Sequence, residues 1–299
     1  MANLEPLIQS IPVAPLKLAS LEGCRTLADQ VNNYLVSFRH ESPTNVGQAD
    51  SLQGYCADSY LLECECPRFG SGEGKGVLKE SVRGCDLFIM VDVTNYSLTY
   101  RVNGYENHMS PDNHYQDLKR IISAADGKAR RINVIMPFLY EGRQHKRSKR
   151  ESLDCALMLQ ELVDMGVSNI LTFDAHDPRV SNSIPLHGFD SFMPTYQFLK
   201  ALVNSVPDFV IDNDHLMIIS PDEGAMGRAV YFSNILGVDM GMFYKRRDYS
   251  TVVNGKNPIV AHEFLGDDVK GKDVIIIDDM ISSGESMLDV AQQIGRAHV

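Results

Sequence analysis

The stretch VIIIDDMISSGES, residues 274–286, decides the fold class. Four apolar residues lead into Asp278 and Asp279, a turn of serine and glycine follows, and residues 287–291 continue with the apolar spacing of a helix. A continuous apolar run that ends in polar residues and enters a helix is typical of a strand buried on both faces of a parallel sheet. This strand, turn and helix therefore predict an α/β fold.

The same alternation recurs along the 299 residues. Expected strands cover residues 60–64, 87–93, 132–138, 169–174, 216–220, 240–244 and 273–278, and expected helices cover 112–125, 152–165, 196–206 and 225–236. Such alternation predicts a parallel sheet with helices on both faces. Residues 94–111 are interpreted as a loop-rich surface excursion.

Composition narrows the class of protein. At roughly 150 residues per domain, the length predicts two domains. A net charge of −11 and a pI near 5.2 argue against nucleic acid or an anionic membrane as the main partner. We expect no membrane span and no signal peptide, because apolar runs are short and the N-terminus lacks a long apolar core. The six cysteines contain no Cys-x-x-Cys pair, so we expect reduced thiols and a cytoplasmic protein.

Residues 278–286 have the chemistry of a ribose-phosphate site. Ligands of parallel sheets bind at the carboxyl ends of the strands. A Ser and Gly turn that opens a helix presents backbone N–H groups to a phosphate, and two carboxylates can accept hydrogen bonds from ribose hydroxyls or hold a divalent cation. The alternative is an acidic strand end before an ordinary capped helix.

Four other segments place polar residues at the ends of expected strands. Residues 143–150 hold five cations in eight positions, which suits polyphosphate, although a solvated basic loop is the alternative. Asp174 and His176 suit a Mg²⁺ site or its outer shell, although His176 can equally be structural. Residues 220–225 place Asp222 beside a glycine turn, and residues 245–247 supply cations that could close over a transferring phosphoryl group.

The ordered segments RFGSGEGKGVLKESVRGCDLFIM, YEGRQHKRSKR, LTFDAH, IISPDEGAMGRA and YKRRD, with residues 274–286, resemble those of the ribose-phosphate diphosphokinases. The resemblance covers roughly residues 21–293. It implies ATP binding by Phe69, Ser71, Glu73, Arg143 and Gln144, ribose 5-phosphate binding by Asp278, Asp279, Ser282, Ser283, Gly284 and Ser286, metal contacts by His176 and Asp222, and catalysis by Lys245 and Arg247.

The reaction that the resemblance implies transfers the β,γ-diphosphate of MgATP to the 1-hydroxyl of ribose 5-phosphate, with AMP as the second product and Mg²⁺ as cofactor. The implied fold is two similar, doubly wound parallel-sheet domains of phosphoribosyltransferase type, at residues 1–190 and 191–299. The implied assembly is a homo-oligomer.

The sequence departs from the family pattern in the same stretch that decides the fold. Ser282 stands where the family has a third Asp, and Glu285 where it has a second Gly. We expect the second domain to be incomplete, because no strand follows the last helix. Residues 294–299 read IGRAHV, which part of a common sequencing adapter would encode, so we expect these six residues to be adapter-derived.

Two alternatives to the diphosphokinase are kept. A non-catalytic regulatory subunit would bind nucleotide and ribose phosphate without turnover, as Ser282 and Glu285 suggest. A phosphoribosyltransferase would share the ribose-phosphate stretch, but it has no need of the Arg143–Gln144 segment.

Overall fold

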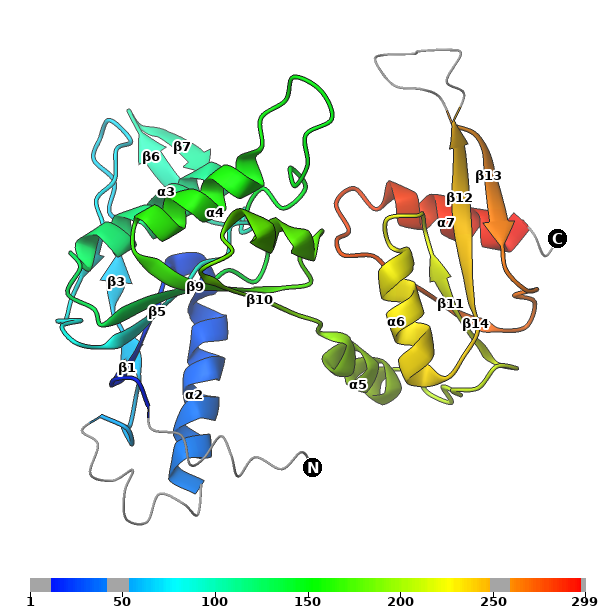
Figure 1. Cartoon of the computed structure of the whole chain (residues 1–299), viewed down its shortest axis with the longest axis horizontal. Helices are drawn as coiled ribbons and strands as arrows, with labels where there is room; N and C mark the ends of the chain where they lie inside the picture. Colours follow the sequence, from blue (N-terminus) through cyan, green and yellow to red (C-terminus); the bar gives the residue numbers. More distant parts are fainter. Residues whose placement is uncertain (1–11, 42–53, 248–258, 297–299) are drawn as a thin grey trace. The chain divides into compact units, whose positions relative to one another are not determined.

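The chain folds into two compact units, residues 1–193 and 194–299. The computed structural model describes residues 12–41, 54–247 and 259–296, and the side chains of 41, 245–247, 259–262 and 296 lie outside that description. Each unit contains its own sheet and helices (Figure 1). The units are described separately below.

The first unit is built on a six-stranded sheet in which every pair of neighbouring strands is parallel. Its order is β10-β9-β8-β5-β1-β2, with bounds β1 Leu16–Ser20, β2 Leu61–Leu62, β5 Asp86–Met90, β8 Arg131–Ile135, β9 Val167–Phe173 and β10 Gly188–Phe192. The predicted parallel sheet is therefore confirmed for this unit. The sequence interpretation missed β1, the helix after it and β10.

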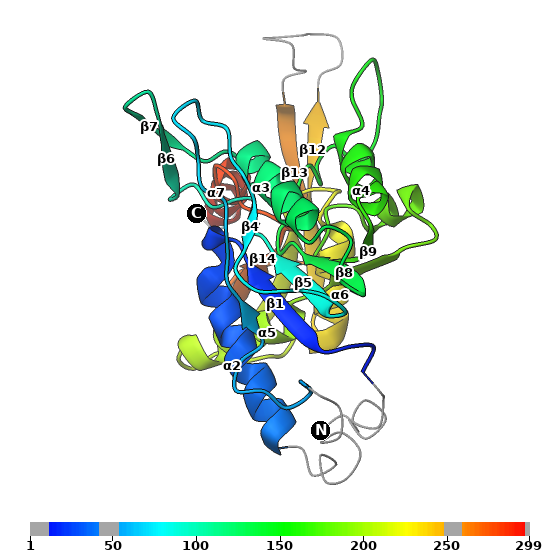
Figure 2. The same ribbon diagram turned by 90° about the vertical axis from the view of Figure 1, so that its left-hand side faces the viewer.

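Alternation along β5 shows why both faces of this sheet are covered. Leu87 and Ile89 face a core completed by α3 (Pro111–Ala124) and α4 (Asp154–Asp164), whereas Phe88 and Met90 face the opposite core beneath α2 (Arg25–Glu41). The two sets of helices lie on opposite sides of the sheet (Figures 1 and 2). Each fully buried aliphatic side chain contributes about 1.5–3 kcal/mol, so the sandwich is stabilised from both sides.

The excursion expected at residues 94–111 contains an antiparallel hairpin, β6 (Thr99–Val102) and β7 (Tyr105–His108). Asn103 and Gly104 connect the strands with φ angles of 50° and 86°. Two consecutive positive φ angles give the tight turn that matches the natural twist of paired strands. The interpretation as a loop was therefore wrong, because it overlooked an Asn-Gly turn between short alternating runs.

Two shorter features complete the first unit. β3 (Cys64–Glu65) pairs with β4 (Val77–Leu78) in an antiparallel ladder, and the short helices η1 (Glu22–Cys24) and η3 (Pro178–Ser183) join larger elements. All six cysteines are free thiols, as expected. Burial raises the pKa of the Cys64 thiol to about 11, so it remains protonated at neutral pH.

The second unit has the sheet order β13-β12-β11-β14. Its bounds are β11 Leu216–Ser220, β12 Met240–Arg247, β13 Ile259–Leu265 and β14 Asp273–Ile276, with helices α5 Thr195–Ser205, α6 Met226–Leu236 and α7 Glu285–Arg296. The pairs of β11 are parallel, as predicted, whereas β13 runs antiparallel to β12. No helix in the described ranges is long and apolar enough to cross a membrane.

Successive residues of β11 again serve two cores. Leu216 and Ile218 pack with Ala229 and Phe232 of α6, whereas Met217 and Ile219 pack with α7. All five residues of β11 are buried. A strand covered on both faces has a fixed register, so the polar residues that follow β11 and its neighbour β14 are held at the same edge of the sheet.

Candidate functional site

The first part of the candidate site is the turn formed by residues 69–73, between β3 and β4. The Phe69 N–H donates to the Glu73 carbonyl at 2.7 Å, and the Gly72 N–H donates to the Phe69 carbonyl at 2.8 Å. The Ser71 hydroxyl donates to the Glu73 carboxylate at 2.8 Å. Phe69 is 54% exposed, which is unusual for a side chain with so much apolar surface. The turn therefore displays the three side chains that the resemblance assigns to ATP.

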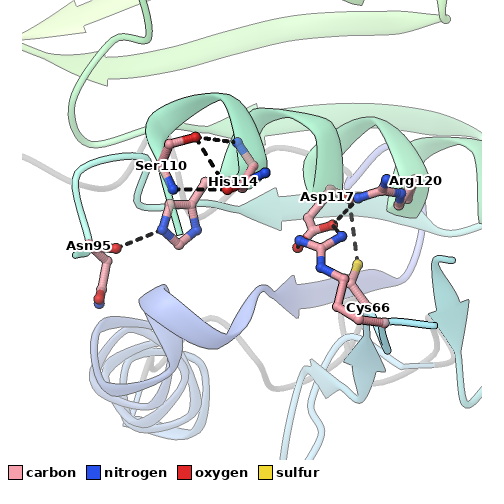
Figure 3. A network of polar contacts seen from close by, with 8 residues as sticks. Cys66, Asn95, Ser110, His114, Asp117 and Arg120 are labelled. Atoms are coloured by element: carbon pink, nitrogen blue, oxygen red, sulfur yellow. Dashed lines mark hydrogen bonds and ion pairs between the residues drawn. The ribbon is translucent and has the colours of Figure 1, made fainter. Parts of the chain in front are cut away.

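A buried ion cluster holds the base of this turn. Arg68 donates two hydrogen bonds, each of 2.8 Å, to the carboxylate of Asp117 on α3. Arg120, one helical turn later, also pairs with Asp117 (Figure 3). The Asp117 side chain is only 6% exposed, so the ion pairs with Arg68 and Arg120 offset the cost of burying it.

The five cations of residues 143–150, called the basic run below, begin after the short turn that follows β8. The Gln144 side-chain amide donates to the Ser152 carbonyl at 2.7 Å, just before α4 begins. In this structure Gln144 therefore ties the basic run to the neighbouring backbone. Arg143 is exposed, as are the four cations between Lys146 and Arg150, so the run presents positive charge to solvent.

His176 lies just beyond β9 and faces the basic run. Its ring centroid is 5.0 Å from that of His145, and His145 Nε2 is 3.6 Å from the Asp177 carboxylate. Hydrogen bonds from Arg179 lower the pKa of Asp177 to about 2. The structure therefore brings the LTFDAH segment together with the basic run, and Asp177 and His145 join a group from which sequence reasoning had selected only His176.

In the second unit, Asp278 and Asp279 follow β14 after one further residue, Ile277. The Asp279 N–H donates to the Asp278 carboxylate at 2.9 Å, and the Arg228 guanidinium lies 3.9 Å from the Asp279 carboxylate. The pKa of Asp278 is raised to about 6, first by burial, then by a side-chain hydrogen bond with Asp279 and by the negative charges of Asp279 and Asp222, although the Asp279 N–H acts in the opposite direction. The strand end is thus crowded with acidic groups.

The stretch after these carboxylates opens α7. Gly284 has a φ of +78°, a backbone conformation that is strained in residues with a side chain. The helix begins at Glu285. The Ser283 hydroxyl accepts from the Glu285 N–H at 3.4 Å. Ser282 and Ser286 are exposed. Because the first N–H groups of a helix have no carbonyl partner within it, this end of α7 can receive an anion.

Asp222 lies in the turn between β11 and α6. One of its carboxylate oxygens accepts from the backbone N–H groups of Gly224 and Ala225, at 2.9 and 3.3 Å. Asp222 is therefore oriented by the turn and contributes to the field that raises the pKa of Asp278. The backbones of Lys245 and Arg247 lie in β12, and their side chains lie outside the described residues.

The carboxylates of Asp222, Asp278 and Asp279 offer the oxygen atoms that a hard divalent cation prefers, and positive charge would relieve the repulsion among them. His176 is a nitrogen donor and fits Mg²⁺ less well. Among the described residues, no group of three or more His, Cys, Asp or Glu side chains could hold a metal ion. Mg²⁺ commonly binds one or two carboxylates and completes its shell with water and substrate phosphates.

Both halves of the chain match known domains. Residues 16–166 match the N-terminal domain of ribose phosphate pyrophosphokinase, and residues 199–299 match the phosphoribosyl transferase domain. The chain belongs to the ribose phosphate pyrophosphokinase family. Pyrophosphokinase is another name for the diphosphokinase that the sequence motifs resemble.

Relatives within this family cover most of the chain. The ribose-phosphate pyrophosphokinase of Chlorobaculum tepidum is 29% identical over 79% of this chain and 65% of its own length, and that of Thermosipho africanus is 30% identical over 78% and 66%. The chain therefore spans just under two thirds of these curated relatives.

A solved structure supports the fold. The phosphoribosylpyrophosphate synthetase of Mycobacterium smegmatis superposes with a TM-score of 0.70 at 22% identity, covering 94% of this chain and 77% of that one. The two phosphoribosyltransferase-type domains predicted from the motifs are thereby confirmed.

Sequence reasoning missed supporting residues of the pyrophosphokinase motifs. Arg228 lies near Asp279, and Arg68 pairs with Asp117, although neither arginine was singled out. Arg228 could have been found, since it is six residues after Asp222 and in the first turn of the next helix. The partner of Arg68 gives no local signal, because Asp117 is 49 residues away in the sequence.

Proposed function

We propose that this chain catalyses the transfer of the β,γ-diphosphate of ATP to the 1-hydroxyl of ribose 5-phosphate, giving 5-phosphoribosyl 1-diphosphate and AMP. One observation carries the proposal: in a chain of the pyrophosphokinase family, Asp278–Ser286 follow the parallel strand β14 and open α7, where carboxylates and backbone N–H groups meet. The carboxylates suit ribose hydroxyls, and the helix end suits the 5-phosphate.

The other residues then have defined roles. Phe69, Ser71 and Glu73 would hold the adenosine part of ATP, and Arg143 with its neighbouring cations would attract the polyphosphate. Gln144 would contact ATP from the position in which its hydrogen bond to the Ser152 carbonyl holds it. Asp222 would bind the Mg²⁺ that neutralises phosphate charge during transfer. His176 is the other metal contact that the resemblance implies.

The test follows AMP formation from ATP by the purified chain, with and without ribose 5-phosphate and Mg²⁺. We expect AMP only when all three are present. ATP consumption that is independent of ribose 5-phosphate would contradict the proposal. Sedimentation of the same sample tests the homo-oligomer that the family resemblance implies.

Lys245 and Arg247 are proposed to stabilise the charge that develops on the transferred group. Lys245→Ala should lower kcat by about 10²–10³-fold, the usual effect of removing one preorganised electrostatic contact, while KM for ATP changes little. Steady-state kinetics with each substrate varied in turn measures both quantities. An unchanged kcat would remove Lys245 from the mechanism.

A regulatory subunit without turnover is the second candidate, because Glu285 places a carboxylate in the first turn of α7. Such a subunit would bind ATP and ribose 5-phosphate in calorimetry and form no AMP. A phosphoribosyltransferase is disfavoured, since residues 16–166 match a domain of the pyrophosphokinases.

A further inference from the structure

The β6–β7 hairpin has an inner and an outer face. Along β6 and the residue before it, Leu98, Tyr100 and Val102 are half-buried, whereas Thr99 and Arg101 are exposed. This alternation is the period of a strand that packs one face against the molecule. A hairpin that served only as a surface excursion would have no need of an apolar inner face.

The inner face and the tip of the hairpin contact the turn of residues 69–73. The Asn103 N–H donates to the Gly70 carbonyl at 3.4 Å. A Cβ atom added to Gly72 would lie 2.9 Å from a methyl group of Val102, and the φ of Gly72 is +93°. The backbone of the turn therefore approaches Val102 as closely as the absence of a side chain permits.

Arg68, which precedes the turn, is held from two directions. Its guanidinium lies 5.3 Å from the centre of the Tyr100 ring, within the range of a cation–π contact. The same guanidinium donates twice to Asp117 on α3. The hairpin and α3 thus restrict Arg68 together, and Arg68 restricts the start of the turn.

The hairpin is itself anchored at both ends to α3. Before it, the Asn95 carbonyl lies 2.7 Å from His114 Nε2 of α3, and after it the Ser110 hydroxyl accepts from the Asn113 N–H and caps the helix (Figure 3). The Met109 N–H donates to the Leu98 carbonyl at 2.9 Å and closes the base of the hairpin. The hairpin is therefore a braced element that can support another segment.

We propose that the β6–β7 hairpin positions the turn of residues 69–73 for nucleotide binding, with Tyr100 and Val102 as positioning residues. This inference rests on the proposed function, in which that turn holds the adenosine part of ATP. A turn with glycine at positions 70 and 72, followed by Gly74, has many conformations available, and its binding conformation must be selected by contacts from outside. Contacts that preform a binding loop increase affinity because less ordering is left for the ligand to drive.

The test compares inner-face and outer-face variants of the full chain. Val102→Ala removes methyl groups that lie against Gly72, and Tyr100→Leu removes the ring beside Arg68. Tyr100→Phe keeps that ring, and Arg101→Ala alters the exposed face of the same strand. Because Tyr100 also lines a cavity of about 270 Å³, shortening it does not disrupt a close-packed core.

We expect the inner-face variants to raise the Kd for MgATP in calorimetry and the KM for ATP in the AMP assay. If the variant turn holds its binding conformation about a tenth of the time, the increase is about tenfold. The KM for ribose 5-phosphate and kcat should stay within twofold of the unaltered chain. Tyr100→Phe and Arg101→Ala should match the unaltered chain in every measurement.

A pair of compensating substitutions tests the contact between Gly72 and Val102 in a second way. Gly72→Ala should weaken MgATP binding through overlap with Val102 and through backbone strain. Gly72→Ala combined with Val102→Ala makes room for the new methyl group and should recover part of the lost affinity. Gly72→Ala combined with Arg101→Ala should recover none.

Several outcomes would overturn the inference. If Val102→Ala and Tyr100→Leu bind MgATP as tightly as the unaltered chain, and the unaltered chain forms AMP, the role of the hairpin is disproved and the proposed function stands. Equal losses for ATP and ribose 5-phosphate, with a lowered melting temperature, would indicate a merely structural role. An unaltered chain that binds no MgATP would remove the proposed function and this inference with it.

Discussion

The turn of residues 69–73 and the stretch of residues 278–286 are both assigned to substrates, but the protein holds them by different means. The first contacts the β6–β7 hairpin and follows Arg68, which pairs with Asp117. The second follows β14, which pairs with the buried strand β11, and its two carboxylates lie beside each other and near Asp222. The first segment is held by packing and ion pairs, whereas the second also carries repelling carboxylates whose charge a ligand would neutralise.

This difference shows two ways to prepare a binding site. A glycine-rich turn needs packing to select one conformation, and the selection is complete before the ligand arrives. A strand end followed by a helix is already fixed by the sheet, so its acidic groups can remain mutually repulsive and respond to a cation or sugar. The predictions below test this comparison.

The largest effect is expected at the buried ion cluster. Asp117→Ala should lower the free energy of unfolding by about 3–5 kcal/mol, because it leaves Arg68 and Arg120 largely buried without their carboxylate. Chemical denaturation of the full chain measures this change.

Glu65→Ala is the matched control for Asp117→Ala, since Glu65 pairs with Lys79 in an exposed ion pair. We expect this control to cost less than about 1 kcal/mol. If Asp117→Ala proved equally mild, the turn of residues 69–73 would not depend on support from α3.

At the second segment, the effect should appear in substrate use rather than stability. Asp279→Asn should lower kcat/KM for ribose 5-phosphate by about 10–100-fold, the range expected when a charged hydrogen-bond acceptor is lost. The KM for ATP should change far less. Asp289→Asn, on the exposed side of α7, serves as the control. A selective loss of ATP binding would reverse the assignment of the two segments.

Local patterns predicted one segment better than the other. Strand β11 has the bounds expected from its apolar run, and the strand, turn and helix around Asp278 need only neighbouring residues to be recognised. The support of Phe69 depends on Asp117 and Val102, which are distant in the sequence and belong to elements whose packing no periodicity reveals. The side chains of Lys245 and Arg247 lie outside the described residues, so their roles stay predictions.

The acidic crowding at the second segment predicts a pH-dependent difference in stability. Because the pKa of Asp278 is raised to about 6, its ionised form destabilises the folded state relative to the unfolded state, where the pKa is about 4. Asp278→Asn should therefore raise the melting temperature at pH 8 in the presence of a chelator. This advantage should shrink as the pH falls from about 6 to about 4, because Asp278 then becomes protonated in the folded protein and finally also in the unfolded protein.

Thermal unfolding at pH 4, 6 and 8 measures this difference, with Asp289→Asn as the control. An advantage of Asp278→Asn that grows toward pH 4 would contradict the assigned repulsion.

The smallest effect is expected from Glu285, the exposed first residue of α7. Glu285→Gln should lower the KM for ribose 5-phosphate by about two- to fivefold at low salt, because a negative charge is removed from the helix end that would receive the phosphate. The difference should diminish at high salt through screening. A higher KM in the variant would mean that Glu285 assists binding.

The spacing of glycines after Phe69 has a consequence for how this segment can vary. A Cβ at Gly72 would meet Val102, one at Gly74 would meet Arg68 and Arg120, and one at Gly76 would overlap the Arg120 carbonyl. Gly70 has open space. A saturation library across residues 69–76, selected for folded protein, should therefore tolerate replacements at Gly70 and reject them at Gly72, Gly74 and Gly76.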